Sequence, residues 1–143
     1  MSTAPIWKKP YTLEAVLARL EGIAPGRLGI TVTEIGPDYL RGAMPVDERH
    51  VQPWRALHGG ISVVLAETLG SIAASLAAPE GFHCVGLEIN ANHIASVPEG
   101  QMVSAECRPF HIGRSTQVWQ TEIRRADGRL SCVSRFTSAV VPD

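Results

Sequence analysis

The segment ISVVLAETLGSIAASLA, residues 61–77, consists of apolar and small residues with a single charged side chain, Glu67. No other formally charged residue occurs from residue 56 to residue 79. A Gly-Gly pair precedes the segment and Pro-Glu-Gly follows it, which predicts one long helix over about residues 59–78. A charge at the centre of a membrane span costs several kcal/mol, so we expect a core helix and no membrane partner.

The rest of the chain predicts one short helix and six strands. A helix is expected from Thr12, a suitable N-cap, to Gly22. Period-two alternation predicts a hairpin over residues 28–36 and 39–46, then strands over residues 83–94, 101–112, 116–125 and 130–141. This order indicates an α+β fold with a mostly antiparallel sheet. Such a sheet encloses the long helix if it curls, and a second subunit could cover the remaining side.

Length and composition predict a single domain over residues 1–143, with residues 1–11 as a flexible or draped arm. The net charge of −1 provides no basic field for nucleic acid. The three cysteines, Cys84, Cys107 and Cys132, form no CxxC pair, and no secretory signal opens the chain. We therefore expect reduced thiols, no metal site and a cytoplasmic location.

Chemical groups gather around the start of the long helix. The first N–H groups of a helix lack internal partners, and glycine at Gly59 lets a ligand approach them, which suits a developing oxyanion. His58 and Gln52 can form hydrogen bonds beside it, and Glu67 can act as a general base or nucleophile. Each group also has a structural interpretation: loop geometry for the glycines, an ion pair for Glu67 and capping for His58.

The spacing of these groups predicts a shared site. Gly59 and Glu67 are eight residues apart, hence roughly 12 Å apart along one helix. Two copies of the helix, antiparallel across a two-fold axis, could bring the start of one to the middle of the other. We therefore expect a homodimer with two such sites. Ser71, one turn beyond Glu67, could orient the carboxylate or a water molecule.

Three motifs, LHGGISVVLAETLGS (57–71), VGLEINANHI (85–94) and HIGRSTQVWQ (111–120), occur in this order. With them the chain resembles the hotdog-fold acyl-CoA thioesterases from about Gly29 to Val141. It is most similar to the group containing the dihydroxynaphthoyl-CoA thioesterase of menaquinone biosynthesis and the enterobactin proofreading thioesterase. The resemblance implies a hotdog fold, a curled antiparallel sheet wrapped around one long central helix, assembled as a homotetramer of two dimers.

The resemblance also implies roles for individual residues. Glu67 matches the catalytic carboxylate and Gly59 the N–H that polarises the thioester carbonyl. His58 and Gln52 match residues that assist around the carbonyl and the water, and Ser71 matches the hydroxyl beside the carboxylate. The positions that the resemblance places near coenzyme A are Asn90, His93, His111, Gly113, Arg114 and Ser115.

Relatives often carry a basic residue just after the Asn-His pair, where this chain has the uncharged residues 95–98. Contact with the nucleotide phosphates would then depend on Arg114, which could also be a solvated turn residue. Candidates for the acyl pocket are Trp54, Met44, Val64 and Thr68.

The reaction that the resemblance implies is hydrolysis of an acyl-CoA thioester, with an aromatic acyl group, to the free acid and coenzyme A. Coenzyme A is part of the substrate, so no separate cofactor is expected. Two alternatives stay open: a hotdog enoyl-CoA hydratase, and a non-catalytic acyl-CoA binding protein. The sequence does not separate a general-base role of Glu67 from a nucleophilic one.

Overall fold

The long apolar segment forms one helix, α3 (Gly59–Ala77), in the computed structural model, which describes residues 4–143. The other elements are the helices α1 (Leu13–Ala18) and α2 (Ala24–Arg27) and the strands β1 (Thr31–Ile35), β2 (Leu40–Pro45), β3 (Phe82–His93), β4 (Met102–Ile112), β5 (Thr116–Arg125) and β6 (Leu130–Pro142). The predicted order of one long helix and six strands is confirmed, and the short α2 is additional.

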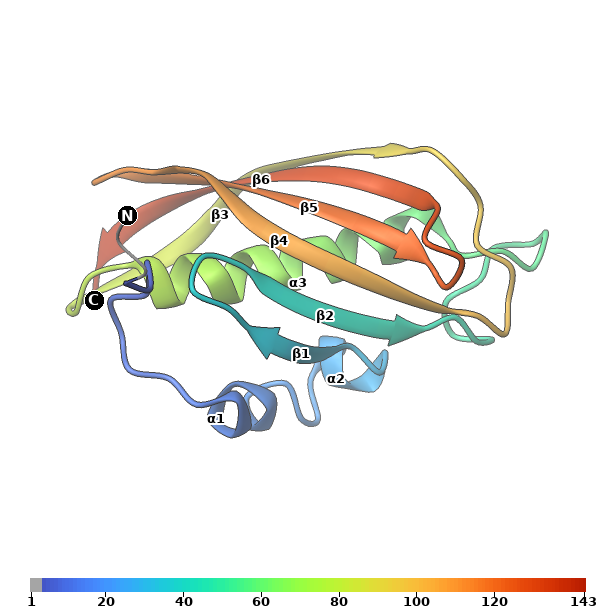
Figure 1. The fold of residues 1–143 in the computed structure, drawn as a ribbon, viewed down its shortest axis with the longest axis horizontal. Helices are drawn as coiled ribbons and strands as arrows, with labels where there is room; N and C mark the ends of the chain where they lie inside the picture. The colour runs from blue at the N-terminus through green and yellow to red at the C-terminus, as the bar shows by residue number, and fades with distance from the viewer. Residues whose placement is uncertain (1–3) are drawn as a thin grey trace.

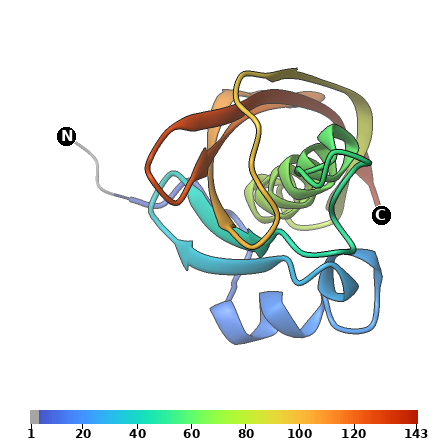
Figure 2. The same ribbon diagram turned by 90° about the vertical axis from the view of Figure 1, so that its right-hand side faces the viewer.

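The six strands form one antiparallel sheet in the order β1-β2-β4-β5-β6-β3. The sheet curls around α3, as the view along the helix shows (Figure 2). In the orthogonal view α1 and α2 lie below the hairpin of β1 and β2 (Figure 1). The predicted fold, a curled antiparallel sheet around a central helix, is confirmed.

One face of α3 is buried in the sheet. Leu65, Leu69, Ala73 and Ala74 are buried there, against strands that include β5 and β6. A Cβ atom at Gly70 would lie 2.8 Å from the ring of Phe136, so only glycine allows β6 to approach this closely. Small residues on α3 therefore set the distance between helix and sheet.

The opposite face of α3 is not covered by the sheet. By length and hydropathy Gly59–Ala77 could cross a membrane, but half of its most apolar window is buried inside the fold. Such burial is typical of a core helix. Glu67 and Ser71 are exposed on the uncovered face, whereas the hydroxyl of Ser62 is buried. The composition of the segment is that of a buried core helix along its whole length, but only one face of the helix is buried in the core.

The N-terminal arm is anchored rather than free at Trp7. The Trp7 ring is buried and stacked on Trp119, with ring centroids 6.0 Å apart. Its Nε1–H donates a hydrogen bond of 2.7 Å to the carbonyl of Gly36, and the N–H of Lys8 donates to the carbonyl of Leu76. Of the two expectations for residues 1–11, a flexible or a draped arm, the draped arm agrees with the contacts of Trp7; residues 1–3 lie outside the described residues.

We expect Trp7→Ala to lower the free energy of unfolding by about 3–5 kcal/mol, because it removes a buried ring and leaves a cavity against Trp119. Urea denaturation at fixed protein concentration measures the change. The matched control is Trp54→Ala, since Trp54 is 83% exposed and its loss should change stability by less than about 0.5 kcal/mol. Equal stability of the two variants would contradict the anchoring role of Trp7.

Candidate active site

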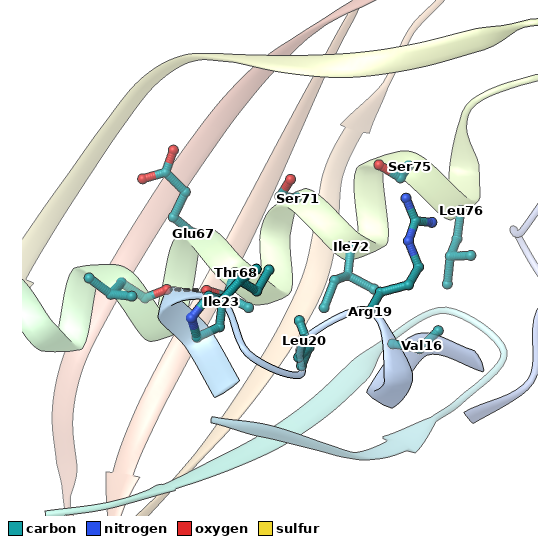
Figure 3. A pocket seen from close by; sticks show the side chains of 12 residues that line it. Val16, Arg19, Leu20, Ile23, Glu67, Thr68, Ser71, Ile72, Ser75 and Leu76 are labelled. Carbon is teal, nitrogen blue, oxygen red and sulfur yellow. Dashed lines mark hydrogen bonds between the residues drawn. The ribbon is translucent and has the colours of Figure 1, made fainter. Parts of the chain in front are cut away.

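A cleft of about 450 Å³ runs along the uncovered face of α3 (Figure 3). One wall comes from α3 itself and includes Glu67, Thr68 and Ser71. The facing wall comes from α1, α2 and the segment between them. The residues of this wall are Val16, Arg19, Leu20, Ile23 and Pro25. The cleft is therefore mostly apolar, with a carboxylate and hydroxyl groups along one side.

Glu67 is exposed in the single chain and lies near β3. No cation pairs with its carboxylate among residues 4–143, so the ion-pair interpretation is not supported. A Cβ atom at Gly86 would lie 3.3 Å from Glu67 Oε1 and 3.2 Å from the Phe136 ring. The irregular register of β3 falls between Gly86 and Glu88. Glycine at this position leaves the carboxylate the space it occupies.

A second, smaller cavity of about 280 Å³ lies at the start of α3. Gln52, Gly59, Ser62 and His93 are among its lining residues. A Cβ atom at Gly59 would lie only 2.8 Å from His93 Nε2, so the backbone and the imidazole are in close contact. The structure therefore brings Gly59, Gln52 and His93 to one cavity.

His58 is the N-cap of α3. Its Nδ1 accepts a hydrogen bond of 2.9 Å from the N–H of Gly60, which confirms the capping interpretation. Because Nδ1 accepts here, the neutral ring carries its proton on Nε2. The side chain is exposed, so this Nε2–H remains a donor beside Gly59. Capping and a role at the site are therefore compatible.

Gln52 lies in a tight loop before α3. Its Oε1 accepts a hydrogen bond of 2.5 Å from the N–H of Trp54, which turns the amide NH₂ into the free donor of the side chain. The Gln52 N–H donates a hydrogen bond to the carbonyl of Ala56, which closes the loop. An ion pair between Arg55 and Glu99, with a shortest N–O distance of 2.6 Å, stabilises it further. Gln52 is therefore presented by a braced loop.

His50 fixes this loop from inside, a role that sequence reasoning missed. It is fully buried: Nε2–H donates to the carbonyl of Leu28 at 2.7 Å, and Nδ1 accepts from the N–H of Asp47 at 3.0 Å. Its own carbonyl accepts from the N–H of His58 at 2.7 Å. A histidine within a polar loop carries no sequence signal for such burial.

The predicted coenzyme A residues fall into two groups that one chain does not bring together. His93 lies at the start of α3, whereas Gly113–Ser115 form the β4–β5 turn. The Ser115 carbonyl accepts from the N–H of Val140, and Val140 pairs with Cys84, whose thiol reaches the Ala74 carbonyl near the end of α3. The turn is therefore at the opposite end of the helix from His93.

The remaining predicted positions near coenzyme A have local contacts. Asn90 donates to both carboxylate oxygens of Glu88 at 3.2 Å. A Cβ atom at Gly113 would lie 2.5 Å from His111 Nε2, so that ring lies against the turn. Arg114 is exposed and has no ion pair with any residue in the described part of the chain. Its position permits contact with an anion.

The predicted acyl-pocket residues also fall into two groups, one that lines the cleft and one that does not. Val64 and Thr68 line the cleft beside Glu67, and the Thr68 hydroxyl donates to the carbonyl of Val64 at 2.6 Å. Met44, however, is fully buried in the core, so its prediction as a pocket residue is wrong for the single chain. Trp54 is exposed and lines neither of these two cavities, and its place in an acyl pocket stays a prediction.

The cysteines are free, as expected. Burial raises the pKa of the Cys107 thiol to about 12, so this group stays protonated and is no nucleophile at neutral pH. Among residues 4–143, no three His, Cys, Asp or Glu side chains are arranged to hold a metal ion.

Comparison with known families identifies the family in which this chain is found. The model of the thioesterase superfamily matches residues 56–132, which covers both cavities' α3 residues and the β4–β5 turn. The chain belongs to the thioesterase superfamily. The 1,4-dihydroxy-2-naphthoyl-CoA hydrolase of Escherichia coli K12 is 51% identical over 136 residues, covering 95% of this chain and 99% of the relative. The proofreading thioesterase EntH of Cronobacter sakazakii is 46% identical over 136 residues, covering 95% and 98%.

Solved structures support the same assignment. The crystal structure of a thioesterase from Haemophilus influenzae matches with a TM-score of 0.92 at 47% identity, covering 96% of this chain and 95% of that one. The resemblance inferred from the motifs is thereby confirmed, and this chain is a hotdog-fold thioester hydrolase.

The structure adds residues to this thioesterase's site that the motifs did not indicate. Gly86 gives Glu67 its space, and the walls from α1 and α2 close the cleft. The helical spacing of Val16 and Leu20 predicted a helix but not what it covers. The glycine in VGLEINANHI was the one available signal for a close approach to β3.

We expect Gly86→Ala to lower kcat for thioester hydrolysis by more than about twofold, because the new methyl group crowds both Glu67 Oε1 and the Phe136 ring and shifts the carboxylate slightly. Thiol release measures kcat, and thermal unfolding checks that the fold persists. Ser104→Ala, an exposed change on β4, is the control. A kcat within twofold of the unchanged protein would show that Gly86 does not position Glu67.

Proposed function

We propose that this thioesterase hydrolyses acyl-CoA thioesters, with a preference for aromatic acyl groups, to the free acid and coenzyme A. The observation that carries the proposal is Glu67, an unpaired carboxylate in a mostly apolar cleft of about 450 Å³. The relative named 1,4-dihydroxy-2-naphthoyl-CoA hydrolase has an aromatic acyl-CoA in its name, which supports the acyl preference. No cofactor is required, because coenzyme A enters as part of the substrate.

The chemistry follows from the groups at the two ends of the site. The Gly59 N–H, at the positive end of α3, donates to the carbonyl oxygen, and such a donor contributes about 3–4 kcal/mol as negative charge develops. His58 and Gln52 supply further donors around the carbonyl and the water. On one route Glu67 deprotonates the attacking water, the carbon–sulfur bond breaks, and the thiolate takes a proton as the free acid leaves, with Ser71 beside the carboxylate. On the other route Glu67 attacks the carbonyl carbon, and expulsion of the thiolate, which takes a proton, leaves an anhydride; water then cleaves the anhydride to release the free acid and restore Glu67.

Two chains form each complete site in this proposal. In one chain Glu67 lies in the large cleft and Gly59 in the smaller cavity, and no residue lines both. Eight residues of helix separate them by roughly 12 Å. A second copy, related by a two-fold axis, supplies Gly59 next to Glu67.

The edge strand β3 offers a surface for this pairing. It is at the end of the sheet order and extends over Phe82–His93, and its exposed side chains include Val85 and Leu87, which are 42% and 59% exposed. A long apolar edge of this kind is a template for pairing with another chain. Since β3 lies beside α3, pairing there brings the two α3 helices together. The family resemblance extends the dimer to a tetramer of two dimers.

The same symmetry supports a coenzyme A site from both chains. His93 and Asn90 lie toward the start of α3 and the Arg114 turn lies toward its end. Two antiparallel helices bring the turn of one chain near the His93 of the other. Arg114, exposed and without an ion pair in the described chain, is the group available for the nucleotide phosphates. The free thiols favour a reducing, cytoplasmic location.

The two alternatives are less well supported. The relatives with a named activity reported above are hydrolases, which favours hydrolysis over hydration of an enoyl-CoA. A non-catalytic acyl-CoA binding protein would not need an unpaired carboxylate in its cleft. A panel of aromatic and medium-chain acyl-CoA substrates separates hydrolysis from both alternatives, because only hydrolysis releases free thiol.

We expect Glu67→Gln to lower kcat about 10²–10⁴-fold with the fold intact, because the amide is nearly isosteric but neither a base nor a nucleophile. Thiol release from benzoyl-CoA measures the change. The matched control is Glu80→Gln, an exposed glutamate just beyond α3 that lines neither cavity. Unchanged turnover in Glu67→Gln would exclude Glu67 from the mechanism, and no thiol release from any acyl-CoA would refute the function.

A further inference from the structure

The cleft beside Glu67 extends well beyond the reacting group. Along α3 it continues past Ser71 to Ser75, eight residues and roughly 12 Å from Glu67. The side chains that line this far part are mostly apolar, namely Val16, Leu20, Ile72 and Leu76. An acyl group held with its carbonyl at Glu67 therefore has room for an elongated apolar body.

The far end of the cleft carries a cation. Arg19, at the end of α1, is exposed and lines the same cleft as Ser75, and in Figure 3 its side chain lies toward the Ser75 end, away from Glu67. Arg19 and Glu67 are the two charged residues that line the cleft. Within residues 4–143 no carboxylate forms an ion pair with Arg19, unlike Arg41 or Arg49. The guanidinium is therefore free to bind an anion brought by a ligand.

Serine hydroxyl groups line the cleft between Glu67 and Arg19. Ser71 and Ser75 lie one turn apart on the α3 wall, and neither hydroxyl has a hydrogen-bond partner among the described residues. A guanidinium and a hydroxyl together present several donors, which suit the two oxygens of a carboxylate. A neutral alkyl end would gain nothing from these donors.

We infer that this far end is a subsite for a carboxylate on the acyl group, with Arg19 as the residue that determines the specificity. The inference rests on the proposed hydrolysis at Glu67. The substrate class is an acyl-CoA with an apolar body and a distal carboxylate. The Glu67 charge repels an anion at the near end and Arg19 attracts it at the far end, so both charges favour one orientation of such an acyl group.

Suberoyl-CoA and octanoyl-CoA form the test pair, because they differ only in the distal carboxylate. We expect Arg19→Met to lower the ratio of kcat/KM for suberoyl-CoA to kcat/KM for octanoyl-CoA about tenfold. The change should come mainly from a higher KM for suberoyl-CoA, because the contact between Arg19 and the distal carboxylate is the same in the ground state and the transition state. Arg19→Lys should retain part of the ratio. Arg27→Met is the control, because Arg27 is an exposed arginine on α2 outside the cleft.

Two results overturn the inference while the proposed function stands. One is a ratio within twofold of the unchanged protein in Arg19→Met; the other is hydrolysis of octanoyl-CoA with no hydrolysis of suberoyl-CoA by the unchanged protein. A ratio that falls equally in Arg27→Met would show a general charge effect and also overturn it. Absence of thiol release from every acyl-CoA in the panel would refute the proposed function and the subsite with it.

Discussion

An α-helix rises about 1.5 Å per residue, and this constraint organises the whole molecule. The oxyanion donor and the carboxylate of the proposed mechanism stand eight residues apart on α3, at Gly59 and Glu67. They cannot meet on one carbonyl carbon within a chain, and they line two different cavities. In our account each chain therefore holds half of each of two sites, and a two-fold axis completes both.

The packing of α3 is compatible with this division. Small residues such as Gly70, Ala73 and Ala74 face the sheet and bring β6 close, so the buried face needs little space. The other face stays free for Glu67 and for the cleft that α1 and α2 close. One helix thus forms both the core and the floor of the site, which explains why a lone charge can stand in so apolar a segment.

Local signals in the sequence predicted most of the fold and the centre of the site. The sequence predicts the last residue of α3 to within one residue of the observed end at Ala77, because glycines and a proline mark the limits of the helix. Tertiary signals were out of reach: nothing local shows that Trp7 stacks on Trp119 or that α1 covers the cleft. Met44 was misplaced although its alternation with Leu40 and Gly42 already marked the inward face of β2.

Complementation between two inactive chains tests the shared site most directly. Glu67→Gln removes the carboxylate and Gln52→Ala removes a donor at the start of α3, and each variant alone should have little activity. When the two variants are co-expressed in equal amounts, about half of the dimers are hybrids of one chain of each variant. Each hybrid has one intact site of two, so the account predicts about a quarter of the activity of the wild-type protein. If the mixture is no more active than the two variants separately, each site lies within one chain and the account is wrong.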